Sequence, residues 1–334
     1  MKKNIALIAG GYSGEFVISL ETAETITKHL DAEKYNVYKI IVDKNDWWYE
    51  TTIGDKVSVD KNDFTIKLNN EKIVFDAAFL AIHGTPGEDG RMQGYLDMIG
   101  LPYTSCNAIV SAVTFNKSYC NKVVDAFNIV NIANSVHLIK NEPYSVGNIL
   151  EKLKLPMFVK PNESGSSLGV SKVKNVEELL PAIENAFKED NQVLIEEYIE
   201  GREVTIGVYR IGNHLHTLPP TEIVSKNEFF DYEAKYTPGV TNEITPAPID
   251  DDVLEQLKNK SEYIYRHLNC RSIVRIDYIL QKGTNKLYFL EVNTMPGQSE
   301  ASIVPQQVHA SGKTLREFYG ELIEDCLMEK TELV

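Results

Sequence analysis

Short apolar runs alternate with polar, glycine-rich turns along the first third of the chain. Runs at Ile5–Ala9, Val37–Val42 and Ala77–Ile82 have the length and composition of buried strands. Between the first two, Val17–Leu30 repeats its apolar residues at helical spacing. This alternation predicts an open α/β sheet, in which ligands bind beyond the carboxyl ends of the strands.

The rest of the chain changes to paired strands with fewer helices between them. We expect two strands around a loop of serines and glycines, then a helix and a strand, and later a long polar loop at Ser225–Asn242 followed by further helices. These elements are predicted at Pro156–Lys160, 169–173, Val176–Phe187, Val193–Tyr198, Asp252–Leu268 and from Thr314 onward. The pattern predicts three domains, at residues 1–104, 105–211 and 212–334.

A predicted β-hairpin near the carboxyl end gathers oxygen ligands. One strand contains Asp277, the other contains Glu291 and Asn293, and a polar Lys-Gly-Thr-Asn-Lys turn joins them. Side chains alternate faces along a strand, so Glu291 and Asn293 point the same way, and a suitable register brings Asp277 opposite them. Buried carboxylates require a compensating cation, and oxygen donors favour Mg²⁺ or Mn²⁺ that also binds phosphates. The alternative is that these acids lie on a solvated sheet face.

The composition excludes several classes of function. The chain has 334 residues and a formal net charge of −14, which argues against nucleic acids and anionic membranes, because both bind basic patches. No apolar run reaches membrane-spanning length, and the one at the start is too short for a signal peptide. The four cysteines lack metal-binding spacing and are expected to be the reduced thiols of a cytoplasmic protein.

Two loops have the composition of nucleotide-binding segments. In 162–169, glycines, serines and consecutive N–H groups could bind phosphate oxygens, and Lys160 just before it could bind the same phosphates. The loop at 225–242 contains Lys235 and Tyr236 and has the length of an active-site lid. A mobile hairpin loop and a solvated crossover are the respective alternatives.

Two loops at the predicted edge of the first sheet could contact a substrate. Glu15 follows a glycine-rich turn, where a carboxylate would repel a pyrophosphate but could hold an ammonium group, unless it merely caps the next helix. His83 opens the loop 83–90 and either contacts a ligand or belongs to the polar surface. Gly312-Lys313-Thr314 resembles the end of a P-loop, but no strand leads into it, so it is expected to start the last helix.

In their order along the chain, these motifs resemble those of ATP-grasp enzymes and, more narrowly, of the D-alanine:D-alanine ligase family. The resemblance extends over nearly the whole chain. The motifs that carry it are Gly10-Gly11-x-Ser13-x-Glu15, His83-Gly-x-x-Gly-Glu-Asp-Gly90, Val159-Lys160-Pro161, Gly165-Ser-Ser-x-Gly169, Glu233-Ala-Lys235-Tyr236, Arg275-Ile-Asp277, Glu291-Val-Asn293-Thr and Pro296-Gly297.

The resemblance implies an ATP-grasp fold, with an N-terminal open α/β domain and two further domains that grip ATP between antiparallel sheets. It implies two Mg²⁺ (or Mn²⁺) ions on Asp277, Glu291 and Asn293. The residues that it assigns to ATP are Lys117, Lys160, Ser166, Ser167, Glu196, Glu197, Tyr198, Ile199, Glu203, Lys235 and Phe289.

The resemblance also implies ligation of two D-alanines through an acyl phosphate, for peptidoglycan precursor synthesis, by a homodimer. Glu15 would hold the first ammonium group, Arg275 and the N–H of Gly297 would stabilise the oxyanion, and Ser302 would bind the second carboxylate. The remaining residues that it implies for the substrate site are His83, Lys235, and Ser166 with Tyr236, which would be hydrogen-bonded to Glu15.

The choice of second substrate is the least determined part of this prediction. Tyr236 favours the dipeptide, because related ligases that make D-alanyl-D-lactate typically lack tyrosine there. Val17 and the run Gln298-Ser-Glu-Ala depart from the family pattern, so a D-alanine:D-lactate ligase or another ATP-grasp carboxylate–amine ligase is the alternative. Two other classes are a non-catalytic nucleotide-binding protein and an NAD-dependent oxidoreductase, and Ala9 and Glu15 count against the latter.

Overall fold

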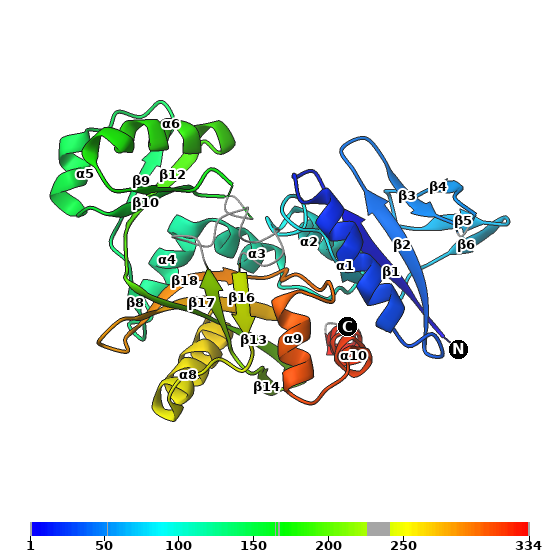
Figure 1. Cartoon of the computed structure of the whole chain (residues 1–334). Coiled ribbons are helices and arrows are strands. Elements are labelled where there is room, and N and C mark those ends of the chain that lie inside the picture. Colours follow the sequence, from blue (N-terminus) through cyan, green and yellow to red (C-terminus); the bar gives the residue numbers. More distant parts are fainter. Residues whose placement is uncertain (1, 52, 164, 166–167, 226–240, 333–334) are drawn as a thin grey trace.

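The computed structural model describes residues 2–51, 53–163, 165, 168–225 and 241–332, which form three large sheets with helices on their faces (Figure 1). The strands are β1 (Lys3–Gly10), β2 (Tyr35–Val42), β3 (Trp47–Glu50), β4 (Lys56–Ser58), β5 (Ile66–Leu68), β6 (Glu71–Ile73), β7 (Ala77–Leu80), β8 (Asn131–Ile132), β9 (Ser135–Ile139), β10 (Met157–Pro161), β11 (Ser171–Val173), β12 (Gln192–Glu197), β13 (Gly201–Ile211), β14 (His214–Thr217), β15 (Thr221–Ser225), β16 (Thr241–Ile244), β17 (Val274–Gln281) and β18 (Leu287–Asn293). The helices are α1 (Phe16–His29), α2 (Arg91–Ile99), α3 (Ala108–Phe115), α4 (Lys117–Asp125), α5 (Val146–Lys152), α6 (Leu179–Glu189), α8 (Asp251–His267), α9 (Ile303–Ala310) and α10 (Leu315–Glu332), with a 3-10 turn at Val176–Glu178.

The first sheet is an open α/β sheet, as predicted. Its order is β4-β3-β2-β1-β7, and β1 runs parallel to both β2 and β7. Alternate residues of β1 enter two different cores, Ile5 and Leu7 on the side of α1 and α10, and Ala6 and Ile8 on the side of α2. Burial on both faces explains the unbroken apolar run of this strand.

The two other large sheets are built mainly from antiparallel pairs, which confirms the predicted fold class. The central sheet has the order β11-β10-β12-β9, and α5 and α6 cover it with a core of its own. The third sheet has the order β16-β15-β13-β17-β18-β8, with β14 paired to β13. Among the described helices, none has the length and apolar character needed to cross a membrane.

The predicted boundary between the second and third domains, at residue 211, does not coincide with a boundary between sheets. Strand β13 ends at residue 211 but pairs along its length with β17, in the third sheet. Helices α3 and α4 pack against β18 of the same sheet. We therefore propose that the central domain comprises about residues 133–199, bounded by the strands of its own sheet, and that β13, α3 and α4 belong with the carboxyl-terminal domain.

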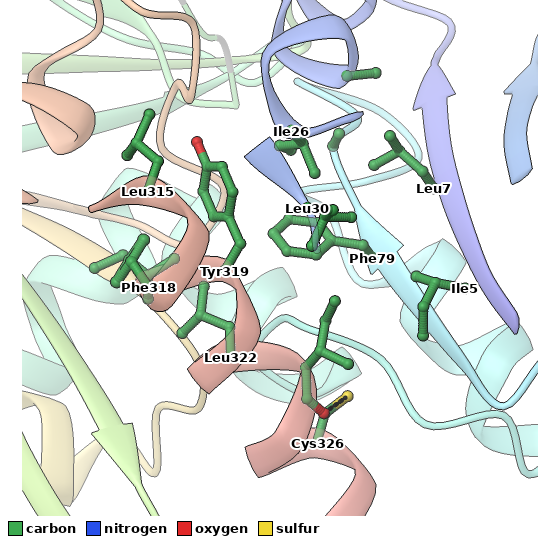
Figure 2. Packing of buried hydrophobic residues seen from close by; sticks show 14 of the residues in the cluster. Ile5, Leu7, Ile26, Leu30, Phe79, Leu315, Phe318, Tyr319, Leu322 and Cys326 are labelled. Carbon is green, nitrogen blue, oxygen red and sulfur yellow. Dashed lines mark hydrogen bonds between the residues drawn. The ribbon is translucent and has the colours of Figure 1, made fainter. Parts of the chain in front are cut away.

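The last helix joins the carboxyl-terminal domain to the first sheet. Figure 2 shows Tyr319 and Leu322 of α10 on the side of Phe79 in the parallel sheet. Phe318 lies on the other side of α10, where its ring meets that of Tyr209 of β13, and all five residues belong to one apolar cluster. The rings of Phe79 and Tyr319 meet edge to face, with centroids 5.7 Å apart. Because α10 belongs to the core of both domains, the two domains share one packed interface.

Replacing Phe318 by alanine tests this interface. The side chain is fully buried, so its loss should lower the free energy of unfolding by about 3–5 kcal/mol. The control is Met328→Ala on the same helix, where the side chain is 51% exposed and the change should be small. Denaturant unfolding measures both, and equal losses in the two variants would contradict the shared core.

Candidate functional site

The predicted hairpin of β17 and β18 has the register that gathers its polar residues. Asp277 lies directly opposite Glu291, and Arg275 lies opposite Asn293, so all four share one face of the sheet. The other face carries the apolar core of α8. Tyr278 pairs with Phe289, which leaves one extra residue on β18 as a β-bulge beside the carboxylates. The hairpin thus has the register on which the predicted gathering of these ligands depended.

Arg275 is the counterion of Asp277. Its Nε and Nη2 donate to the two carboxylate oxygens at 2.8 Å each, and the hydroxyl of Thr205 on β13 also donates to this carboxylate. Burial alone would lower the pKa of the Arg275 guanidinium, but Asp277, Glu291 and Glu203 outweigh burial, so its pKa is raised. The guanidinium thus stays charged beneath three carboxylates.

Two lysines from other elements also pair with carboxylates of the candidate site. Lys117 begins α4, and its Nζ lies 3.7 Å from Glu291 Oε2. Lys160 ends β10 and pairs with Glu196 of β12, whose other oxygen accepts from Asn121 Nδ2 at 2.9 Å. The two lysines assigned to phosphates are therefore held by carboxylates between the central and carboxyl-terminal sheets.

The donor set on β17 and β18 fits a hard divalent cation. Asp277 and Glu291 are like charges placed directly across a strand pair, an arrangement that needs positive charge nearby. The described residues contain no cluster of three His, Cys, Asp or Glu side chains arranged around one point. Two carboxylates with the amide of Asn293 match instead the sparse protein shell that magnesium completes with phosphate oxygens and water.

The first residue of the predicted phosphate loop, Asn162, is hydrogen-bonded to the start of α4. The backbone oxygen of Asn162 accepts from Lys117 N at 3.2 Å, and its side-chain oxygen accepts from Ser118 N at 2.8 Å. Farther along the loop, a Cβ at Gly165 would lie 2.7 Å from Glu15 Oε2, so this glycine lies directly against the Glu15 carboxylate. The loop thus reaches from the central domain to the first helix of the N-terminal domain.

Glu15 stands at the start of α1, but its side chain makes no capping hydrogen bond. Ser13 joins its loop to the next one, because the Ser13 hydroxyl donates to the His83 carbonyl at 3.0 Å and accepts from Glu15 N at 3.2 Å. Gly84, with a φ of +68°, lets the two loops meet beside the Glu15 carboxylate. The Glu15 carboxylate therefore lies where these two loops meet, and it does not cap α1 through its side chain.

His83 is buried rather than part of the polar surface. Its Nε2 lies 3.1 Å from the hydroxyl of Thr22. Burial lowers the pKa of this imidazole, and Arg275 lowers it further, against opposing effects from Glu15 and the backbone of Met295. A neutral imidazole bonded to α1 can position its loop, whereas the sequence suggested a direct substrate contact.

Residues assigned to the adenine and ribose lie along β12 and β13. Glu197 accepts from Asn134 N at 2.8 Å, and Tyr198 stacks under Lys172. Ile199 follows in the connection to β13, where Glu203 shares the sheet face of Asp277. Phe289 is buried in the core cluster that includes α4 and α8.

The start of α9 brings Ser302 close to Gly297, two residues predicted to bind the substrate. Ser302 precedes the helix, and its hydroxyl lies 2.7 Å from that of Ser299 and 2.8 Å from where a Cβ on Gly297 would stand. Lys313, in the rejected P-loop motif, lies just before α10 and pairs with Glu321 of that helix at 2.6 Å. Ser166, Ser167, Lys235 and Tyr236 lie outside the described residues.

Glu88 is a site residue that the sequence analysis missed. Its carboxylate accepts from Gly84 N at 3.1 Å. Burial, together with the charges of Glu15 and Glu291, raises its pKa to about 8. In the sequence, Glu88 could have been identified from its place in the loop 83–90, where it and another acid stand between two glycines. This carboxyl lies where the Glu15 end and the Glu291 end of the site meet.

Comparison with known proteins gives two family matches and close relatives. The model described as D-ala D-ala ligase N-terminus matches residues 4–106, and the one described as D-ala D-ala ligase C-terminus matches residues 126–324. A D-alanine–D-alanine ligase of Parabacteroides distasonis is 46% identical over 330 residues, 99% of either chain.

Solved structures agree over the same length. The VanG D-Ala:D-Ser ligase of Enterococcus faecalis has a TM-score of 0.87 and 29% identity, covering 98% of this chain and 100% of that one. A D-alanine–D-alanine ligase of Bacillus anthracis complexed with ATP has a TM-score of 0.79 and 28% identity, covering 99% and 100%.

Replacing Glu88 by glutamine should change how stability depends on pH in the metal-free and nucleotide-free protein. A carboxyl whose pKa rises from 4.5 to about 8 on folding binds more protons when folded, so its contribution to stability falls as pH rises through that window. The wild-type free energy of unfolding should therefore fall relative to the variant between pH 5 and 8. Glu71→Gln, at an exposed site, is the control, and parallel curves for Glu88→Gln and wild type would refute the shift.

Proposed function

The chain belongs to the D-alanine–D-alanine ligase family, and on that premise we propose that it joins two D-alanines into D-alanyl-D-alanine while converting ATP to ADP and phosphate. The product would serve peptidoglycan precursor synthesis in the cytoplasm. The observation that carries the proposal is the shared sheet face of Asp277 and Glu291, with Arg275 paired to the first and Lys117 to the second. This face has the charges needed to bind a metal-bound triphosphate.

The nucleotide would lie between the central and carboxyl-terminal sheets. Lys117 and Lys160 would bind its phosphates, with Ser166, Ser167 and Lys235. The residues proposed for the adenine and ribose are Glu196, Glu197, Tyr198, Ile199, Glu203 and Phe289. The solved Bacillus anthracis ligase with ATP supports ATP as the co-substrate of this family.

Asp277, Glu291 and Asn293 would hold two Mg²⁺ or Mn²⁺ ions. Bound there, such ions neutralise phosphate charge and align the transferred phosphoryl group. The site already holds the charges that this binding needs. Arg275, Lys117 and Lys160 each pair with a carboxylate, and each of these carboxylates is itself proposed to bind a metal ion or the nucleotide. On nucleotide binding, the lysines would turn from carboxylates to phosphates, and Arg275 would be released toward the reacting carbonyl.

The substrate end is formed by loops of the N-terminal and carboxyl-terminal domains. Glu15 would hold the ammonium group of the first D-alanine, whose carboxylate oxygen forms a bond to the γ-phosphorus as the bridging P–O bond breaks. The amine of the second D-alanine then forms the C–N bond, and phosphate leaves. Arg275 and the N–H of Gly297 would stabilise the oxyanion formed in that step.

The second D-alanine would be held by its carboxylate at Ser302, beside Gly297. His83 and Glu88 would position the loop between the two substrates, and Ser166 and Tyr236 would close the site by hydrogen bonds to Glu15. Excluding water matters because hydrolysis of the acyl phosphate would discard the activated group. We also propose that the enzyme acts as a homodimer.

A second candidate differs in the second substrate. The structural likeness to the VanG D-Ala:D-Ser ligase, with a TM-score of 0.87, favours testing D-serine beside D-lactate. The higher identity to the Parabacteroides ligase, 46% against 29%, supports D-alanine as the main substrate.

Product analysis tests the proposed reaction. With ATP, Mg²⁺ and D-alanine, mass spectrometry should detect D-alanyl-D-alanine in amounts equal to the ADP released. Equimolar D-serine or D-lactate should give minor mixed products, because the Parabacteroides relative at 46% identity is a D-alanine–D-alanine ligase. Equal turnover with L-alanine alone would overturn the substrate assignment, and a dominant mixed product would favour the second candidate.

Asp277→Asn tests the metal face. Loss of one ligand charge should lower kcat by about 100-fold or more. It also leaves Arg275 buried without its partner, so stability should fall as well. The matched control is Glu222→Gln, which breaks the bidentate pair with Arg202 on the other face of the same sheet. Activity per folded molecule should fall in the first variant and stay near wild type in the second, and an unchanged kcat in Asp277→Asn would remove this residue from the metal site.

A further inference from the structure

Glu243 is an acidic residue of the carboxyl-terminal sheet to which the proposed reaction assigns no role. It lies on the edge strand β16 and pairs with Ile223 of β15, which pairs in turn with Glu203 of β13. Directly paired residues share a face of a sheet, and Glu203 lies two residues from Thr205, the partner of Asp277. Glu243 therefore belongs to the same face of the sheet as the proposed metal ligands.

Helix α9 is fixed to this face by Gln307. The Gln307 side chain is fully buried, and its Oε1 accepts from Gly207 N while its Nε2 donates to the Thr205 carbonyl, both at 3.0 Å. A Cβ at Gly207 would lie 2.8 Å from Gln307 Oε1, so the glycine leaves room for this amide. These contacts hold α9, with Ser302 at its start, in a fixed position on β13.

Gln306, the neighbouring residue of α9, extends to Glu243. Its Nε2 donates to Glu243 Oε2 and to the Ala301 carbonyl. Gln306 N also donates to the Ser302 carbonyl at 3.2 Å, which places Gln306 one helical turn from Ser302. Glu243 is thus held beside the residue proposed to bind the carboxylate of the second D-alanine.

The Glu243 carboxylate has a hydrogen bond but no ion pair. Within the described part of the chain, Asp277 and Glu291 each have a cation within ion-pair distance, and Glu243 has none. Glu243 is partly buried, and burial raises the pKa of its carboxyl, against opposing effects from Gln306 and from the charge of Arg275. A partly buried carboxylate is stabilised by a cation, and none of the described residues pairs with this one.

We propose that Glu243 binds the ammonium group of the second D-alanine and thereby selects an amino acid over a hydroxy acid. The inference rests on the proposed ligation and adds a specificity-determining residue to it. D-Alanine enters from neutral solution as a zwitterion, and the surroundings of α9 offer Ser302 to its carboxylate and Glu243 to its ammonium group. Arg275, whose charge acts on Glu243, is the residue proposed to stabilise the oxyanion that the same amine forms by attack. D-Lactate has a hydroxyl group at this position and would leave Glu243 without a cation.

A purely structural role for Glu243 predicts a different result. If it only joined β16 to α9 through Gln306, its replacement would displace Ser302. D-Alanine and D-lactate both present a carboxylate to Ser302, and both react with the same acyl phosphate. Such a displacement would therefore impair the two second substrates alike, whereas loss of an ammonium site would impair D-alanine alone.

The test measures D-alanyl-D-alanine and D-alanyl-D-lactate formation by Glu243→Gln, which keeps an oxygen for Gln306 but removes the charge. The KM for the second D-alanine should rise by about 10- to 100-fold, because a hydrogen bond between charged groups is lost. The rate with D-lactate should stay near the wild-type rate, so the share of D-alanyl-D-lactate from an equimolar mixture should increase. The matched control is Glu255→Gln, an exposed position on α8, which removes the same charge and should leave both products unchanged.

Thermal melting verifies the folding of these variants, and Glu243→Ala gives a second measurement that should show the same shift toward D-lactate. Equal losses with both second substrates, or an unchanged KM for D-alanine in the folded variants, would overturn the role of Glu243 and leave the ligation itself intact. A wild-type chain that forms no dipeptide from ATP, Mg²⁺ and D-alanine would instead refute the proposed ligation, and the role of Glu243 with it.

Discussion

Carboxylates that face a cleft need positive charge beside them, and this requirement organises the whole site. Asp277, Glu291 and Glu196 lie on two sheets, and each has a cation within ion-pair distance, which for Asp277 is Arg275 of the same strand. Removing one partner from such a pair leaves an uncompensated charge and costs about 3–5 kcal/mol when the pair is buried. One pair lies within β17, one joins β10 to β12, and one joins the start of α4 to β18, so each carboxylate is compensated before any ligand binds.

The fold supplies the frame in which these charges meet. The N-terminal sheet and the carboxyl-terminal domain share an apolar core through α10, whereas the central domain has a separate core around β10 and β12. Gly165 of the central domain lies against Glu15 of the N-terminal domain, at the end of the site proposed for the amino acid. One end of the cleft thus has the lysines and carboxylates suited to a nucleotide, and the other has the glutamates and loop N–H groups suited to an amino acid.

Features that depend on the alternation of side chains or on the order of neighbouring elements were predicted from local patterns in the sequence. The alternation of side chains along β17 and β18 was enough to predict that Asp277 faces Glu291, and the missing strand before Lys313 was enough to reject a P-loop. Contacts between distant segments were not predictable in this way. The pairing of β13 with β17 joins segments far apart in sequence, and the raised pKa of Glu88 depends on burial and on the charges of Glu15 and Glu291, which come from distant segments.

The central claim is that this cleft transfers the γ-phosphoryl group of ATP to the carboxylate of an alanine. D-Alanine labelled with ¹⁸O in its carboxylate tests it directly, because the oxygen that attacks phosphorus leaves with the phosphate. The account predicts one ¹⁸O atom in the inorganic phosphate for each dipeptide formed. Unlabelled phosphate, or label found in AMP, would contradict it.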